Sequence, residues 1–259
     1  TPLLRPLQLL TLRIIHEYLT GVPLDSVHTP LQASEYLDAI MSLRTGLLST
    51  AKDYRYRVLP SSAYAALTSL GRSVSSSSSC VSKFVARSLS SSSAAAPINS
   101  LPPASRHEEL STALFAGTDT SSSTSLYCVS RLSSASLRRR CREDRDHMSR
   151  CVKETMRLHP VAPMIVRNVT HPSSPRARPP PESRAQAEGA DAAGLHVLWL
   201  NAANRDPKVF VDPDSFRPDR ANLHEVLTFG RGRRGCPGRD IGVRVVEANV
   251  WAMLESWEW

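Results

Sequence analysis

Residues 229–238 read FGRGRRGCPG, and they constrain the fold more than any other part of the chain. Three glycines precede Cys236 and one follows it. Glycine allows positive φ and close backbone approach, so such a loop can fold tightly around one sulfur or one flat ligand. The residues from Arg239 onward suit an amphipathic helix. The segment therefore predicts a tight loop that presents Cys236, a residue type that ligates metals as the thiolate, just before a helix begins.

The loop has five fixed positions when it is written as F-x-x-G-x-R-x-C-x-G, namely Phe229, Gly232, Arg234, Cys236 and Gly238. This pattern resembles the haem-binding loop of the cytochrome P450 family of haem-thiolate monooxygenases. The resemblance implies that Cys236 is the axial ligand of the haem iron, that Arg234 holds a haem propionate and that Phe229 shields the sulfur. A thiolate ligand pushes electron density towards O–O cleavage. The alternative is a basic, glycine-rich turn with an incidental cysteine.

Residues 116–120 read AGTDT and follow an apolar helical pattern. A glycine inside a helix costs roughly 1 kcal/mol relative to alanine, and threonine hydroxyls can bond the backbone and bend a helix. A helix loosened here could pass protons to bound oxygen, although AGTDT also suits a helix end followed by a turn. The segment resembles the oxygen-activation segment of the same family. The resemblance implies that Asp119 and Thr120 serve proton delivery.

Glu154 and Arg157 lie three positions apart in KETMRLHP and so share one face of a predicted helix. An exposed pair of this kind contributes little to stability. KETMRLHP, however, resembles the E-x-x-R segment of the same family, and FRPDR at residues 216–220 resembles its F-x-P-E-R segment. The resemblance implies a buried structural network of Glu154, Arg157 and Arg220.

Composition sets broader bounds on the chain. Its 259 residues can bury a sizeable core, and a formal charge of +8 suits a nucleic acid, an anionic membrane surface or an acidic redox partner. We expect no nucleic-acid partner. The five cysteines contain no C-x-x-C pair, which favours reduced thiols over a disulfide framework.

The chain divides by composition into three parts. Residues 1–70 show helical periodicity, and residues 71–105 read as a flexible linker or surface loop rich in serine and proline, in which Val81, Phe84 and Val85 allow one short helix. For residues 106–259, the resemblance implies a partial haem-thiolate monooxygenase domain with irregular inserts at 121–148 and 172–194. We expect residues 75–105, 121–148 and 172–190 to be the least ordered. Strands are expected at 161–169 and 195–200, which gives a mainly α fold with a small β component, an incomplete cytochrome P450-like fold.

The resemblance implies a function for the chain. A haem-thiolate monooxygenase holds haem b and inserts one oxygen atom of O₂ into a small organic substrate, with electrons that a reductase draws from NADPH. KETMRLHP and FGRGRRGC are similar to the plant-type microsomal branch. We therefore expect the full-length relative on the cytosolic face of the endoplasmic reticulum membrane, attached by an N-terminal helix that this chain lacks, since no run here is long enough to span a bilayer. We expect this chain to be truncated or impaired and at best a weak haem binder.

Two alternatives stay open. The chain could be a non-catalytic remnant that keeps the cysteine loop without holding haem. It could also be a basic nucleic-acid-binding module with a zinc site, since Cys141, His147, Cys151 and His159 lie beside a run of arginines. Their spacing, C-x5-H-x3-C-x7-H, matches no familiar zinc pattern.

Overall fold

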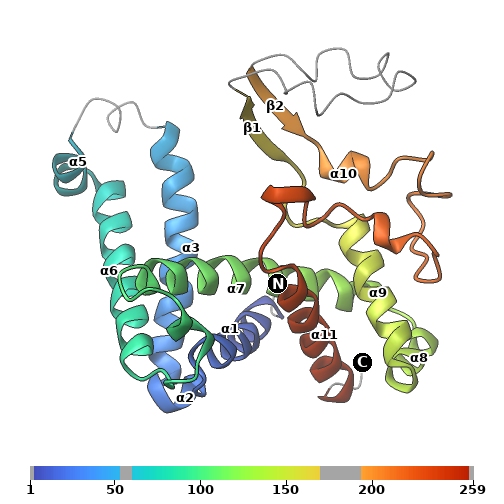
Figure 1. The fold of residues 1–259 in the computed structure, drawn as a ribbon, viewed down its shortest axis with the longest axis horizontal. Coiled ribbons are helices and arrows are strands. Elements are labelled where there is room, and N and C mark those ends of the chain that lie inside the picture. Colours follow the sequence, from blue (N-terminus) through green and yellow to red (C-terminus); the bar gives the residue numbers. More distant parts are fainter. Residues whose placement is uncertain (1–2, 53–59, 170–193, 257–259) are drawn as a thin grey trace. The chain divides into compact units, whose positions relative to one another are not determined.

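The structure is a computed structural model that describes residues 3–52, 60–169 and 194–256. It is mainly helical with one two-stranded sheet, as the sequence predicts (Figure 1). The chain forms two compact units. The first contains residues 1–130 and 238–259, and the second contains residues 131–237.

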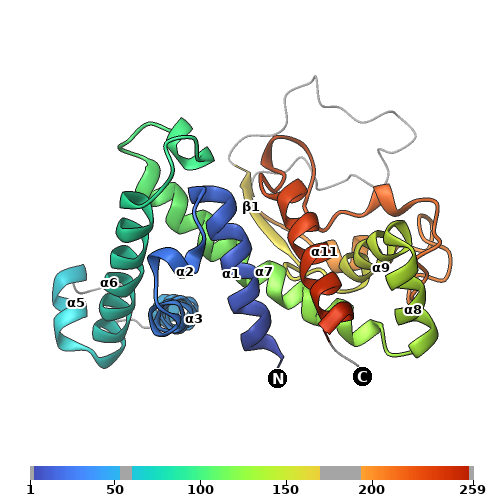
Figure 2. The same cartoon turned by 90° about the horizontal axis from the view of Figure 1, so that it is seen from below.

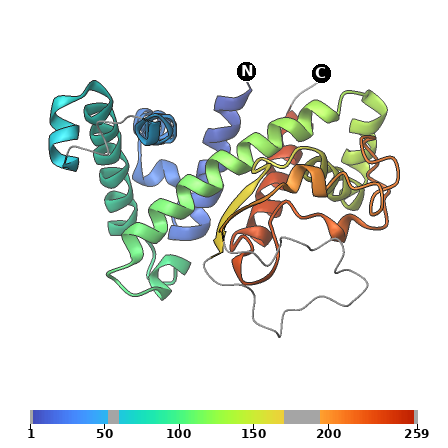
Figure 3. The same cartoon turned by 90° about the horizontal axis from the view of Figure 1, so that it is seen from above.

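The first unit is built from helices alone within the described residues. Helix α3 lies beside α6 (Figure 1), α1 lies beside α11 (Figure 2), and the short α5 lies against α6 (Figure 3). Its elements are α1 (Leu4–Thr20), α2 (Leu24–Val27), α3 (Pro30–Lys52), α5 (Ser61–Leu67), α6 (Ser69–Ser90), the 3₁₀ turn η1 (Pro97–Ser100), α7 (Arg106–Arg131) and α11 (Arg239–Ser256). The helices expected in residues 1–70 are confirmed.

Helix α6 corrects the prediction that residues 71–105 are a flexible linker, because 20 of them, residues 71–90, lie in this helix. Val81, Phe84 and Val85 recur at helical spacing and are buried in the core. The serines of residues 75–79 lie mostly on the exposed side. Burial of one apolar stripe thus outweighs the low helix propensity of serine, which is only a weak local preference.

Residues 121–148 are also helical, which corrects the prediction of an irregular insert. They contain the end of α7, all of α8 (Ala135–Glu143) and the start of α9 (Arg145–Leu158). The hydroxyls of Thr124 and Ser125 donate to the carbonyls one turn back, each at 2.8 Å. A small hydroxyl satisfied in this way can be buried at low cost. One face of α7 is therefore buried although many of its residues are polar.

The second unit combines α8 and α9 with a small antiparallel sheet. Strand β1 (Ile165–Val169) pairs with β2 (Gly194–Leu198), with Ile165 opposite Leu198. Both strands lie where the sequence predicts strands. Residues 172–190 and the insert at 172–194, apart from Gly194, lie outside the described residues. The remaining elements are α10 (Leu200–Ala203) and the 3₁₀ turns η4 (Leu223–Glu225) and η5 (Gly232–Arg234).

Among the helices of the described residues, none combines the length and the apolar character that crossing a bilayer requires.

Candidate functional site

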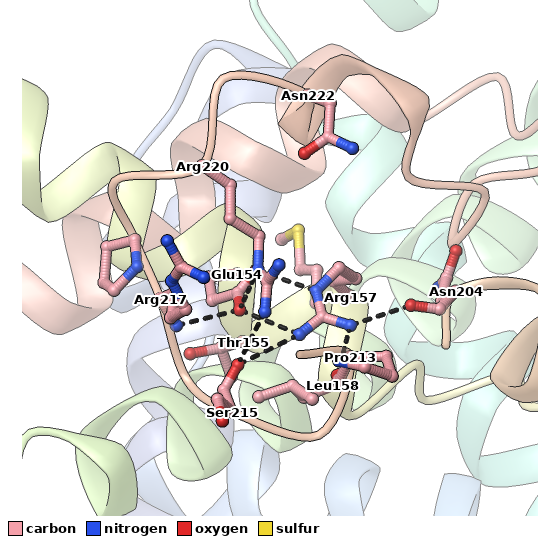
Figure 4. Close-up of polar contacts among 12 residues, drawn as sticks. Glu154, Thr155, Arg157, Leu158, Asn204, Pro213, Ser215, Arg217, Arg220 and Asn222 are labelled. Atoms are coloured by element: carbon pink, nitrogen blue, oxygen red, sulfur yellow. Dashed lines mark hydrogen bonds and ion pairs between the residues drawn. The ribbon is translucent and has the colours of Figure 1, made fainter. Parts of the chain in front are cut away.

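Glu154, Arg157 and Arg220 meet in the interior of the second unit (Figure 4). Glu154 and Arg157 are separated by three positions on α9, and both side chains are fully buried. Arg157 donates from Nε and Nη2 to the two carboxylate oxygens, each at 2.8 Å. Arg220 donates from Nε to Oε1 of Glu154 at 3.1 Å. The structure thus brings together the three residues that the resemblance groups.

Every donor of the Arg157 guanidinium has a partner. Two of its five N–H groups point to Glu154, and the other three meet backbone carbonyls of Asn204, Pro213 and Ser215 at 2.7–3.2 Å (Figure 4). Its guanidinium carbon also lies 5.0 Å from the centre of the Phe210 ring. A buried arginine is tolerated when its charge is paired and its donors are satisfied. Arg157 therefore anchors the irregular segment 204–215 to α9.

Arg220 fastens the other end of the same segment. It donates to the carbonyls of Val211, Asp212 and Ser215, while the backbone N–H of Arg217 donates to Glu154 at 2.9 Å. Asp212 adopts φ of 48°, a left-handed conformation that aspartate accepts more readily than most residues. One carboxylate and two guanidinium groups thus hold a stretch with no regular structure of its own.

The sequence reasoning missed Asn204 and Thr228, which connect α9 to the cysteine loop. The fully buried Asn204 accepts from the backbone N–H of Leu227 at 2.8 Å and donates to the Thr228 hydroxyl at 3.1 Å. That hydroxyl donates to the carbonyl of Met156 at 2.7 Å. Thr228 directly precedes Phe229, so this chain of bonds fixes where the loop starts. In the sequence, the one indication of this role is that Thr228 stands directly before the motif.

The loop closes on itself in front of Cys236. The backbone N–H of Cys236 donates to the carbonyl of Phe229 at 2.8 Å, and that of Gly235 donates to Gly232 at 3.0 Å. Gly230 and Gly232 have φ of 66° and 70°, which L side chains rarely adopt. A Cβ on Gly235 would lie 3.2 Å from the carbonyl oxygen of Gly232. The glycines are therefore needed for the shape of the loop.

Cys236 and Arg234 are both exposed. Arg231 in the same loop is tied to Glu225 at 2.6 Å, and the hydrogen bond from Arg231 holds the pKa of the Glu225 carboxyl below its usual range. Gly238 directly precedes α11 and belongs to the first unit, as do Asp119 and Thr120. The other predicted site residues belong to the second unit.

Asp119 and Thr120 lie in α7, which runs unbroken through AGTDT. The Thr120 hydroxyl donates to the carbonyl of Ala116 at 2.6 Å, and Asp119 forms an ion pair with Arg44 at 2.8 Å. A Cβ on Gly117 would lie 2.7 Å from Cδ1 of Ile15. The glycine therefore permits close packing between α1 and α7, and the helix does not end at it.

The four-residue zinc set proposed from the sequence is wrong. Cys141, His147 and Cys151 do lie together, but Nε2 of His159 accepts from Arg131, with Nη2 at 2.6 Å and Nε at 3.1 Å. Burial and the charge of Arg131 lower the pKa of His159. His159 is held at the end of α9 by this contact, away from the other three.

Comparison with known proteins gives one consistent family. The cytochrome P450 family model matches residues 192–259. Cytochrome P450 81F1 of Arabidopsis thaliana is 31% identical over 123 residues, which are 44% of this chain and 22% of that protein. Flavonoid 3′,5′-hydroxylase CYP75B138 of Crocosmia x crocosmiiflora is 31% identical over 185 residues, 56% of this chain and 32% of that protein.

The fold agrees with the sequence match. A six-coordinated cytochrome P450 from Thermus thermophilus superposes with a TM-score of 0.73 over all of this chain and 62% of the other, at 20% identity. The chain is therefore similar to the cytochrome P450 family in sequence over residues 192–259 and in its fold. It spans between a fifth and a third of the length of the curated relatives that it matches.

Proposed function

We propose that the chain is the haem-binding part of a monooxygenase that takes haem b through Cys236. The observation that carries this is the loop itself, in which glycines close the backbone and leave the cysteine exposed just before a helix. The Cys236 residue is exposed, and a Cβ on Gly232 would meet no atom within 4 Å, so the loop has open space that suits a flat, bulky ligand. The residues present thus fit a haem-thiolate site.

Each residue then has a distinct task. Cys236 ligates the iron, Arg234 pairs with a propionate through its planar guanidinium, and Phe229 shields the sulfur. Gly232 and Gly238 give the loop its turn and its entry into α11. When bound, haem supplies the chemistry of O₂ activation. Backbone amides of the loop are proposed to donate to the sulfur, which would disperse its charge.

Asp119 and Thr120 are proposed to deliver protons. Thr120 can release its hydroxyl from the Ala116 carbonyl and donate from Oγ1, while Asp119 holds a carboxylate beside Arg44. Glu154, Arg157 and Arg220 are proposed to act structurally, because their side chains are buried and bonded to one another and to the backbone.

The whole protein is proposed to act on a small organic substrate with O₂ and with electrons from an NADPH-dependent reductase. By analogy with the plant relatives, it is proposed to work on the cytosolic face of the endoplasmic reticulum membrane.

The test is the carbon monoxide difference spectrum of the reduced chain after addition of haem. We expect a thiolate-type Soret band that disappears in Cys236→Ala and persists in Cys80→Ala, a matched control in α6. If the band persists in both variants, the haem is bound elsewhere in the chain. Absence of haem uptake in the wild-type chain would favour the remnant hypothesis. A substrate turned over beside the reductase would in turn exclude that hypothesis.

A further inference from the structure

Two cysteines and one histidine converge where α8 meets α9 in the second unit. Cys141 lies in the last turn of α8, and His147 and Cys151 lie one turn apart on α9. The two Sγ atoms are 3.8 Å apart, and Sγ of Cys151 is 3.7 Å from Nε2 of His147. All three side chains are buried, and all three ligand atoms lie within 4.8 Å of one another. None of the three side chains has a role in the proposed haem site.

The local sequence builds this arrangement. Asp144 alone separates the two helices, and its side chain accepts from the backbone N–H of His147 at 3.0 Å, which caps α9. The cap fixes His147 in the first turn of α9. Because residues four apart share a helix face, Cys151 then points the same way as His147. The short connection brings Cys141 back onto that face.

The distances are those of ligands on one tetrahedral ion. Zinc–sulfur bonds of about 2.3 Å at a tetrahedral angle separate two sulfurs by about 3.8 Å. With a zinc–nitrogen bond of about 2.05 Å, sulfur and nitrogen are separated by about 3.6 Å. The 3.8 and 3.7 Å observed match both values. A disulfide needs about 2.05 Å between the sulfurs, so the two thiols are not bonded to each other.

The charges of the three ligands also favour a divalent cation. Two thiolates and one neutral imidazole cancel the charge of a divalent cation, which removes the penalty of burying a net charge. Thiolate and imidazole are ligands that zinc favours, whereas calcium and magnesium take oxygen. The neighbouring Arg140 and Arg142 are exposed, so their charged groups are solvated.

We propose that Cys141, His147 and Cys151 bind one Zn²⁺ ion that fastens α8 to α9. No fourth His, Cys, Asp or Glu joins the group in the part of the chain that the structure describes. Three protein ligands leave the fourth position to water or to an external ligand. The ion stabilises the helix that carries Glu154, and this site does not depend on haem binding.

The experiment titrates the purified, reduced full chain with Zn²⁺, and with Co²⁺ as a spectroscopic probe. We expect one zinc per chain by elemental analysis, a thiolate-to-cobalt charge-transfer band, and a melting temperature raised by more than about 5 °C. Cys141→Ser and His147→Gln should each weaken zinc binding by more than about 100-fold, since even outer-shell changes cost 10- to 100-fold. Cys80→Ser should bind as the wild type does.

A second measurement needs no variant and so does not depend on whether the variants fold. Zinc should slow alkylation of Cys141 and Cys151 at least about tenfold, and leave that of Cys128, a buried cysteine of the first unit, unchanged. The proposal is overturned if the wild type retains no zinc. It is also overturned if Cys141→Ser binds zinc like the wild type, if Cys128 is protected equally, or if mass spectrometry of the chain as purified finds a Cys141–Cys151 disulfide.

Discussion

Glu154 pairs with two buried guanidinium groups and is, among the residues that the structure describes, the anion that both of them contact. Replacing it by glutamine keeps its shape and leaves Arg157 and Arg220 without a counter-charge. Breaking a buried pair in this way costs about 3–5 kcal/mol. We therefore expect Glu154→Gln to lower the free energy of unfolding by that amount, measured by urea denaturation of the full chain.

Arg217 supplies the matched control. Its backbone N–H reaches Glu154, but its side chain is exposed and forms ion pairs with Asp212 and Asp219. Surface pairs are worth about 0–1 kcal/mol, so Arg217→Ala should change stability by no more than that. A Glu154→Gln variant as stable as Arg217→Ala would show that the buried network does not support the fold.

His28 is a second residue whose charge state is coupled to folding. It stacks on Phe84 with ring centres 3.8 Å apart and shares a hydrogen bond of 2.9 Å with Ser88. Burial, followed by the charges of His16 and Arg87, lowers the pKa of His28 from 6.5 to about 4. The folded state therefore binds fewer protons than the unfolded state between these two values.

The sign of the pH dependence follows. Where the unfolded state binds more protons, stability rises with pH. The contribution of His28 is thus fully present above pH 6.5 and is lost as the pH falls towards 4, by up to roughly 3 kcal/mol. We expect the urea midpoint to drop between pH 7.5 and 5. His147 and His159 also have lowered pKa values, so the informative comparison is His28→Gln, whose midpoint should drop less. An equal drop in both proteins would contradict the prediction.

Among the elements, α6 differs clearly from the prediction, because its sequence suggests a linker and the structure has a helix. Ser76 is exposed in the middle of this helix. Proline there removes a backbone hydrogen bond and clashes with the preceding turn, at a cost of about 3 kcal/mol or more. We expect Ser76→Pro to lower the melting temperature of the full chain clearly, and Ser76→Ala to leave it unchanged or raise it slightly. A linker would tolerate both changes, so equal melting temperatures would refute the helix.

The elements also show what the sequence could predict. Apolar periodicity identified α1 and α3, the cysteine motif predicted the loop, and the amphipathic pattern from Arg239 onward predicted α11. The helices at α6 and at the end of α7 were missed, because serine and threonine weaken any local signal for a buried face. Their hydroxyls are satisfied by carbonyls of the same helix, as for Ser125, which composition cannot reveal. Tertiary packing decides these segments.

The same limit applies to the site. Short motifs located Glu154, Arg157 and Cys236, since each motif fixes several residue types at close spacing. Asn204 and Thr228 belong to no such motif, and their importance comes only from bonds that cross 23 to 72 positions of the chain. Long-range hydrogen bonds of this kind leave no periodic trace in a sequence.

At the scale of the whole molecule, the dominant property is a formal charge of +8, from 32 basic and 24 acidic side chains. Part of this charge is exposed on the cysteine loop, where Arg231, Arg233 and Arg234 precede Cys236 by two to five positions. An excess of one sign steers an oppositely charged partner and speeds association. If a reductase supplies electrons, as proposed, its docking surface should be acidic.

This expectation can be tested by reversing one charge in each unit. Arg233→Glu and Lys83→Glu both change the net charge from +8 to +6, but only Arg233 lies in the cysteine loop. Attraction between exposed charges is screened beyond about 10 Å at 0.1 M salt. We expect Arg233→Glu to slow reduction of the haem-loaded chain by the reductase several-fold more than Lys83→Glu does at low salt, measured by stopped flow under carbon monoxide. The difference should vanish at high salt, while reduction by dithionite stays equal in both variants. Equal slowing by the two reversals would mean that net charge alone guides the reductase, with no docking surface at the loop.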